Sequence, residues 1–135
     1  MTSAPRILLI DDNADIRETI GARLNASGFA VTTAASGREG LEAAAASEFS
    51  LILLDMLMPQ QDGVATYNAL RADPKTQQIP VILLTAMAVE THWEALPDDA
   101  GAPCFVMGKP YDLGILLTRV RDVLGRERPE SVSGS

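Results

Sequence analysis

The chain has 135 residues, which is enough for one domain with its own buried core. Acidic residues number 18 against 11 basic, and the formal net charge of −7 argues against this domain binding nucleic acid through phosphates. A single cysteine excludes an internal disulfide. No apolar run approaches the ~20 residues of a membrane span, and no signal-peptide pattern opens the chain, so we expect a cytoplasmic protein.

The first third of the chain predicts two strand–helix units. Residues 6–10 predict a short buried strand, which is apolar after Arg6 and ends at Asp11 and Asp12. A helix that stops near Gly28 should follow, because apolar residues recur every four positions; they are Ile16, Ile20 and Leu24. Residues 29–33 predict a more polar strand, nearer a sheet edge. An alanine-rich helix begins at Ser36 or Gly37 and runs to about residue 47.

The middle third predicts a strand buried on both faces. Residues 51–54 are apolar without alternation, as in a parallel sheet covered by helices, and Asp55 ends the run. Gly63 begins a helix that fades at residues 73–74. Residues 81–84 predict a fourth buried strand, which ends at Thr85.

The last third predicts two further helices around a fifth strand. Val89, Trp93 and Leu96 lie at helical spacing before a proline, and residues 104–107 form the strand that Lys109 closes. The final helix should stop at Gly125. Its apolar stripe consists of Leu113, Leu116, Leu117, Val120, Val123 and Leu124.

Five strands, each followed by a helix, predict an α/β fold with right-handed crossovers. The fold class is a (βα)5 doubly wound, five-stranded parallel sheet with helices on both faces. We expect one domain over residues 5–125 and a mobile polar tail over residues 126–135.

Polar residues end four of the predicted strands, and parallel strands present their carboxyl ends at one edge. These residues are Asp11, Asp12, Asp55, Thr85 and Lys109. Three carboxylates at one edge repel one another unless a cation lies among them, and hard oxygen ligands suit Mg²⁺. Lys109 adds a positive charge and Thr85 a hydrogen-bond donor for an oxyanion. The pattern predicts phosphoryl transfer with Asp55 as the nucleophile.

Each of these residues, taken alone, has a structural explanation. An aspartate after a strand is usually a turn residue or a helix cap, and Asp12 or Asn13 could simply cap the first helix. Thr85 alone would be an ordinary strand-end hydroxyl, and Lys109 a solvated surface charge. The specificity lies in their combination at successive strand ends.

With these motifs the chain resembles a receiver domain of the two-component response-regulator family. The resemblance covers about Arg6 to Leu124 and implies the sheet order 2-1-3-4-5. It rests on Ile10-Asp11-Asp12, Leu54-Asp55-Met56-Leu57-Met58-Pro59 with Asp62-Gly63, Leu84-Thr85-Ala86, and Lys109-Pro110.

The resemblance implies a role for each acidic residue. Asp55 would accept a phosphoryl group from a phosphohistidine on a sensor histidine kinase or a histidine phosphotransfer protein. Asp12, Asp55 and the backbone carbonyl of Leu57 would bind Mg²⁺ directly, and Asp11 would bind it through water.

The resemblance also implies what phosphorylation does. Lys109 and Thr85 would contact the phosphoryl oxygens and bias a protein-interaction surface, which would bind an unknown downstream partner or, on phosphorylation, a second copy of the chain. Catalysis would be limited to self-phosphotransfer and slow autodephosphorylation. No contact with nucleic acid or membrane is expected of this domain.

Two features depart from the family pattern. The family's aromatic switch position, three before Lys109, holds Val106, and Phe105 precedes it. Either the switch is absent, or a bulge near residues 107–108 restores the direction of Phe105. Two positions that flank the phosphoryl group hold the apolar residues Leu57 and Met87, which predict a long-lived aspartyl phosphate.

Other function classes fit less well. An aspartyl phosphatase would need Asp-x-Asp-x-Thr after its first strand, and the residue two after Asp11 is Asn13. A flavin-binding module would need a phosphate loop there, which Asp-Asp-Asn-Ala-Asp would repel. A degenerate receiver that acts as a phosphorylation-independent scaffold is the remaining alternative.

Overall fold

The computed structural model describes residues 4–55, 62–85, 104–108 and 113–126. Five parallel strands form one sheet in the order β2-β1-β3-β4-β5, which confirms the expected fold class. The strands are β1 (Arg6–Ile10), β2 (Ala30–Ala34), β3 (Leu51–Asp55), β4 (Val81–Thr85) and β5 (Cys104–Gly108). The described helices are α1 (Ala14–Ala26), α2 (Gly37–Ala46), α3 (Asp62–Ala72) and α4 (Leu113–Arg126).

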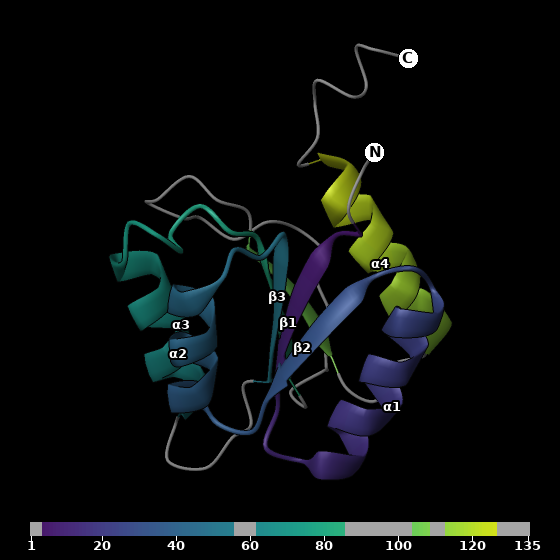
Figure 1. Cartoon of the computed structure of the whole chain (residues 1–135), viewed down its shortest axis with the longest axis horizontal. Coiled ribbons are helices and arrows are strands. Elements are labelled where there is room, and N and C mark those ends of the chain that lie inside the picture. Colours follow the sequence, from purple (N-terminus) through teal and green to yellow (C-terminus); the bar gives the residue numbers. More distant parts are fainter. Residues whose placement is uncertain (1–3, 56–61, 86–103, 109–112, 127–135) are drawn as a thin grey trace.

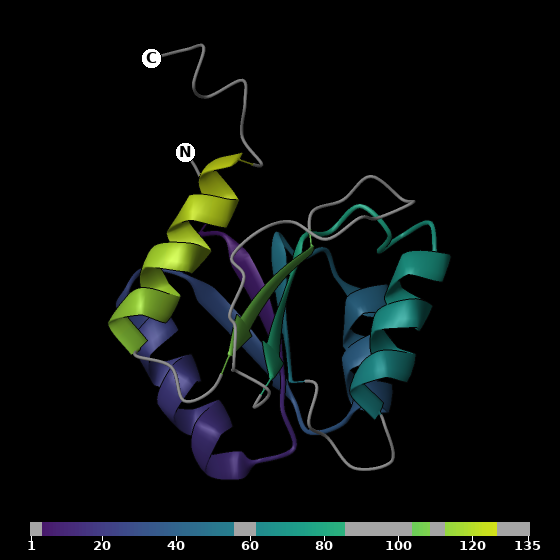
Figure 2. The ribbon, with the colours of Figure 1, turned by 180° about the vertical axis from the view of Figure 1, so that it is seen from behind.

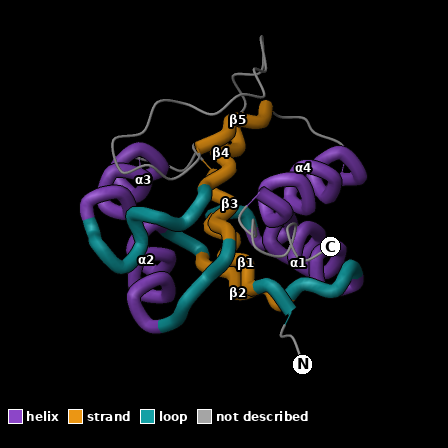
Figure 3. Tube along the Cα trace, turned by 90° about the horizontal axis from the view of Figure 1, so that it is seen from above, coloured by secondary structure: helices purple, strands orange, loops and turns teal. Residues whose placement is uncertain are grey.

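Helices cover both faces of this sheet. Helices α1 and α4 lie on one face, and α2 and α3 lie on the other (Figures 1 and 2). The view from above shows the sheet as a single layer between the two helix pairs (Figure 3). Successive side chains of β1 alternate between the two cores: Ile7 and Leu9 pack with α1 and α4, whereas Leu8 and Ile10 pack with the α2 and α3 side. This alternation explains why the strands are apolar without interruption.

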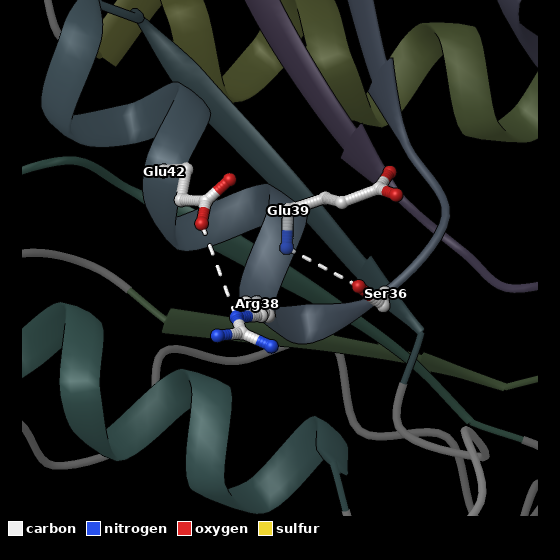
Figure 4. Close-up of polar contacts among 4 residues, drawn as sticks. All are labelled: Ser36, Arg38, Glu39 and Glu42. Carbon is white, nitrogen blue, oxygen red and sulfur yellow. Dashed lines mark hydrogen bonds and ion pairs between the residues drawn. The ribbon is translucent and has the colours of Figure 1, made fainter.

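A side-chain cap starts helix α2 at the edge of the sheet where the polar residues collect. The Ser36 hydroxyl accepts a hydrogen bond from the Glu39 N–H (3.2 Å), and the Glu39 carboxylate accepts one from the Ala35 N–H (2.9 Å). Figure 4 shows the first contact beside the exposed pair of Arg38 and Glu42, whose Nε and Oε2 atoms lie 3.9 Å apart. The cap satisfies two backbone N–H groups at the start of the helix, whereas the exposed ion pair adds little to stability.

Helix α2 lies against β1 through a glycine. A Cβ atom added at Gly40 would lie 2.4 Å from Cδ1 and 2.7 Å from Cγ1 of Ile10. Such distances are too short for any side chain, so the absence of a side chain at Gly40 sets how closely α2 approaches the sheet. Gly21 on α1 has more room, since its Cβ would lie 3.8 Å from Cγ2 of Thr33.

Side chains hold the connection between α3 and β4. Arg71 donates from Nη1 to the carbonyl oxygens of Ile79 (2.7 Å) and Gln77 (3.2 Å). The buried Thr76 hydroxyl donates to the Leu70 carbonyl at 2.6 Å. These bonds satisfy carbonyls at the end of α3 and fix the entry to β4.

Strand β2 lies at an edge of the sheet, as its polar sequence predicts. Its Ala30 N–H donates inward to the Pro5 carbonyl (2.9 Å), so the N–H of the next residue, Val31, is directed away from β1. Asn25 at the end of α1 covers that outward group, because its Oδ1 accepts from the Val31 N–H at 3.3 Å.

Some helix and strand boundaries in the structure differ from the predicted ones. Strand β2 begins and ends one residue later than expected, and α4 continues through Gly125 to Arg126, so the predicted stop at Gly125 is wrong by a residue. The predicted helix around Val89, Trp93 and Leu96 and the tail from residue 127 lie outside the described residues. None of the described helices is long and apolar enough to cross a bilayer.

The pairing of β5 bears on the aromatic position. Phe105 pairs with Ile82 and Val106 with Leu83, and the one-to-one register continues to the pair of Thr85 and Gly108. No bulge therefore interrupts residues 104–108, and of the two alternatives for the aromatic position this register does not support the one with a bulge.

Candidate metal and phosphoacceptor site

Strand register brings the acidic residues to one edge of the sheet. Ile10 at the end of β1 pairs with Leu54 of β3, so the residues that follow them, Asp11 and Asp55, end neighbouring strands. Asp55 also pairs with Leu84 of β4. The central strand of the sheet thus carries Asp55 and holds it between two neighbours.

Three carboxylates meet at this edge. One oxygen each from Asp11, Asp12 and Asp55 lies within 4.8 Å of the others. Asp11 is fully buried, Asp55 is 2% exposed, and Asp12 is exposed. Among the described residues, the cluster consists of carboxylate oxygens, which are hard donors, and Asp12 is open to solvent. This donor set fits Mg²⁺.

The structural explanations account for part of the cluster. Asn13 caps α1, because its Oδ1 accepts from the Ile16 N–H at 3.1 Å, so Asp12 is not the cap. Asp11 does have a turn role, since its Oδ1 accepts from the Asn13 N–H at 2.9 Å. Helix α3 begins at Asp62, too far along the chain for Asp55 to cap it. The positions of Asp12 and Asp55 are therefore not explained by capping.

The remaining predicted site residues are placed by backbone alone or lie outside the described part. Thr85 is the last residue of β4, next to the strand that carries Asp55. Lys109 directly follows Gly108, the last residue of β5, but Lys109 and Leu57 themselves lie outside the described residues. Their roles stay predictions.

One residue that contacts the site was not predicted from the sequence. Arg17 donates from Nη1 to the backbone carbonyl of Asp11 at 2.8 Å. The sequence did contain a signal for this contact. Arg17 lies near the start of α1, where the helix dipole disfavours a positive charge, and the two aspartates that precede the helix could offset that cost.

Comparison with known proteins identifies the family. The family model of the response regulator receiver domain matches residues 7–121. The chain belongs to this family of two-component signalling proteins.

Curated relatives extend beyond the length of this chain. RpaA of Synechocystis, named a DNA-binding dual master transcriptional regulator, is 36% identical over 122 residues, which cover 90% of this chain and 50% of RpaA. The transcriptional regulatory protein PrrA of Mycobacterium tuberculosis is 36% identical over 134 residues, or 98% of this chain and 55% of PrrA. The chain thus spans about half the length of these relatives.

Solved structures match over nearly their whole length. The chemotaxis response regulator CheY4 of Vibrio cholerae has a TM-score of 0.74 at 29% identity, with 90% of this chain and 99% of CheY4 covered. The receiver domain of the sensor histidine kinase PA1611 from Pseudomonas aeruginosa has a TM-score of 0.75 at 28% identity, with 91% and 99% covered. That structure is described as having a magnesium ion coordinated in its active-site cleft.

Proposed function

We propose that this chain is a cytoplasmic, phosphoryl-accepting module of a two-component or phosphorelay system. A sensor histidine kinase or a histidine phosphotransfer protein would supply the phosphoryl group. The observation that carries the proposal is the cluster of Asp11, Asp12 and Asp55 at the carboxyl edge of the sheet.

Asp55 is the nucleophile of this proposal. A carboxylate oxygen of Asp55 attacks the phosphorus, the P–N bond of the phosphohistidine breaks, and its electron pair leaves with the imidazole. The product is an aspartyl phosphate. Because Asp55 ends a strand paired on both sides, its backbone is fixed before the donor arrives, which favours an oriented attack.

The other residues would hold the charges of the reaction. Asp12, Asp55 and the Leu57 carbonyl would bind Mg²⁺ directly, and Asp11 would do so through water. Bound Mg²⁺ would neutralise negative charge on the phosphoryl oxygens. Lys109 would pair with the same oxygens, and Thr85 would donate a hydrogen bond to one of them.

The product would act as a signal, with no substrate turned over beyond one phosphoryl group. Phosphorylation would shift a two-state surface toward a form that binds a downstream protein or a second copy of the chain. The net charge of −7 favours protein over nucleic acid as the direct partner of this domain. An intact acidic cluster disfavours the degenerate-scaffold alternative.

We further propose that the aspartyl phosphate is long-lived. Leu57 and Met87 would present apolar side chains beside the phosphoryl group, where a polar group would help to place an attacking water. Leu57→Asn should therefore shorten the lifetime of the phosphorylated state, measured as loss of phosphate from the purified domain. An unchanged or longer lifetime in Leu57→Asn would contradict this reasoning.

Intact-protein mass spectrometry tests the main proposal. After incubation with acetyl phosphate and Mg²⁺, the chain should carry a single phosphoryl adduct. Asp55→Ala should lose the adduct, and His92→Ala, which removes the single histidine, should keep it. Absence of an adduct on the native chain would falsify the proposal.

A further inference from the structure

The exposed member of the acidic cluster needs something to hold it in place. Asp12 lies at the surface, whereas Asp11 and Asp55 are buried among packed strands. Like charges within 4.8 Å push Asp12 toward solvent when no cation is bound. Its backbone must therefore be fixed if its carboxylate is to stay beside the other two.

The peptide that joins Asp11 to Asp12 is anchored at its carbonyl. That carbonyl oxygen accepts a 2.8 Å hydrogen bond from Nη1 of Arg17. On the other side of the residue, the Asp11 N–H donates to the Ala34 carbonyl of β2 at 3.1 Å. The two contacts fix both peptide planes that flank Asp11. The plane held by Arg17 also contains the backbone nitrogen of Asp12.

The anchor itself is held by helix α1. The Arg17 N–H donates to the Asn13 carbonyl at 3.0 Å, and Asn13 caps the same helix. Arg17 is half-buried, so its side chain is confined between the helix and the end of β1. A charged donor in such a setting makes a stronger hydrogen bond than a neutral one.

We propose that Arg17 is a positioning residue for cation binding: its bond to the Asp11 carbonyl holds the Asp11–Asp12 peptide in the orientation that keeps the Asp12 carboxylate beside Asp55. The inference rests on the proposed function, because it assumes that these carboxylates bind a divalent cation.

The direction in which cation affinity changes when Arg17 is replaced separates a positioning role from an effect of its charge. Loss of a positive charge near a cation site favours cation binding, since it removes a repulsion. Loss of an anchor that orients a ligand weakens binding, commonly by 10- to 100-fold for residues that support metal ligands. The two effects oppose each other, so a weakened site points to positioning.

Mn²⁺ is a suitable probe, because free Mn²⁺ is counted directly by electron paramagnetic resonance. The full chain, Arg17→Met, Arg17→Lys and Arg23→Met are titrated in parallel. Arg23 is the matched control, since it lies on the exposed face of α1 and its loss changes the net charge equally. We expect about tenfold weaker binding in Arg17→Met, unchanged or tighter binding in Arg23→Met, and recovery of most affinity in Arg17→Lys.

The controls keep the two proposals apart. A native chain that binds no Mn²⁺ would refute the cation site and the proposed function with it. A native chain that binds, with Arg17→Met equal to or tighter than the native chain, would overturn the positioning role alone. Urea unfolding shows whether each variant is folded during titration. If Arg17→Met is not folded, Arg17→Gln takes its place, and the same loss is expected because its amide is too short to restore the contact.

Discussion

Gly40→Ala should destabilise the domain, although alanine is the better helix former. The new methyl group would lie 2.4 Å from Cδ1 and 3.3 Å from Cγ2 of Ile10. Ile10 is fully buried, so its side chain has no solvent-exposed position to move to. Either α2 must move away from the sheet or Ile10 must leave its preferred rotamer.

The size of the effect follows from two opposing terms. Overpacking a core costs about 1–3 kcal/mol, and the short contact to Ile10 favours the upper end, about 3 kcal/mol. Alanine regains about 1 kcal/mol in a helix relative to glycine. We therefore expect Gly40→Ala to lower the free energy of unfolding by about 2 kcal/mol. Gly21→Ala meets only ordinary contact at 3.8 Å and should raise it by about 0.5–1 kcal/mol.

Urea denaturation of both variants measures these changes, and Ile10→Val tests their cause. Ile10→Val removes the nearest atom, Cδ1, and should cost about 1 kcal/mol alone. In the Gly40→Ala background it should cost less, because it removes the shortest contact while Cγ1 of residue 10 stays 2.7 Å from the new methyl group, so the two substitutions should couple by about 0.5 kcal/mol. Strict additivity, or a Gly40→Ala domain as stable as Gly21→Ala, would refute the packing argument.

Three further substitutions test single contacts by urea denaturation. Asn13→Ala removes the cap of α1 and should cost about 1 kcal/mol, whereas no loss would mean that another group caps the helix. Thr76→Val leaves the Leu70 carbonyl without its 2.6 Å donor in a buried site and should cost about 1–3 kcal/mol; an unchanged midpoint would show that the bond contributes nothing. Asp12→Asn should raise stability in EDTA by on the order of 1 kcal/mol, because it removes a like charge, and should reduce the stabilisation that Mg²⁺ adds. Equal stabilisation by Mg²⁺ with and without Asp12 would exclude it as a ligand.

The strands were predictable because burial on both faces leaves an unambiguous pattern. Uninterrupted apolar runs mark the three inner strands, β1, β3 and β4, and the parallel arrangement then places their last residues together. The meeting of Asp11, Asp12 and Asp55 also requires β1 to lie beside β3, and that strand order was implied by the family resemblance.

Contacts that depend on detailed packing were not predictable. Gly40 carries no side chain, so nothing in the sequence shows that Ile10 fills the space above it. The bond of Arg17 to the Asp11 carbonyl depends on how α1 leaves β1, which spacing alone does not determine. Helix α4 runs through Gly125, because the cost of one helical glycine, about 1 kcal/mol, is small enough for its neighbours to offset.

Asn25 gives the open edge of the sheet a protective role. A free edge strand offers unpaired N–H groups to any passing chain, and such pairing begins edge-to-edge aggregation. In β2 the outward N–H of Val31 is already occupied by the Asn25 side chain. A second strand would have to displace that bond before it could extend the sheet on this side. A side chain of the domain's own first helix therefore acts against strand addition at this edge.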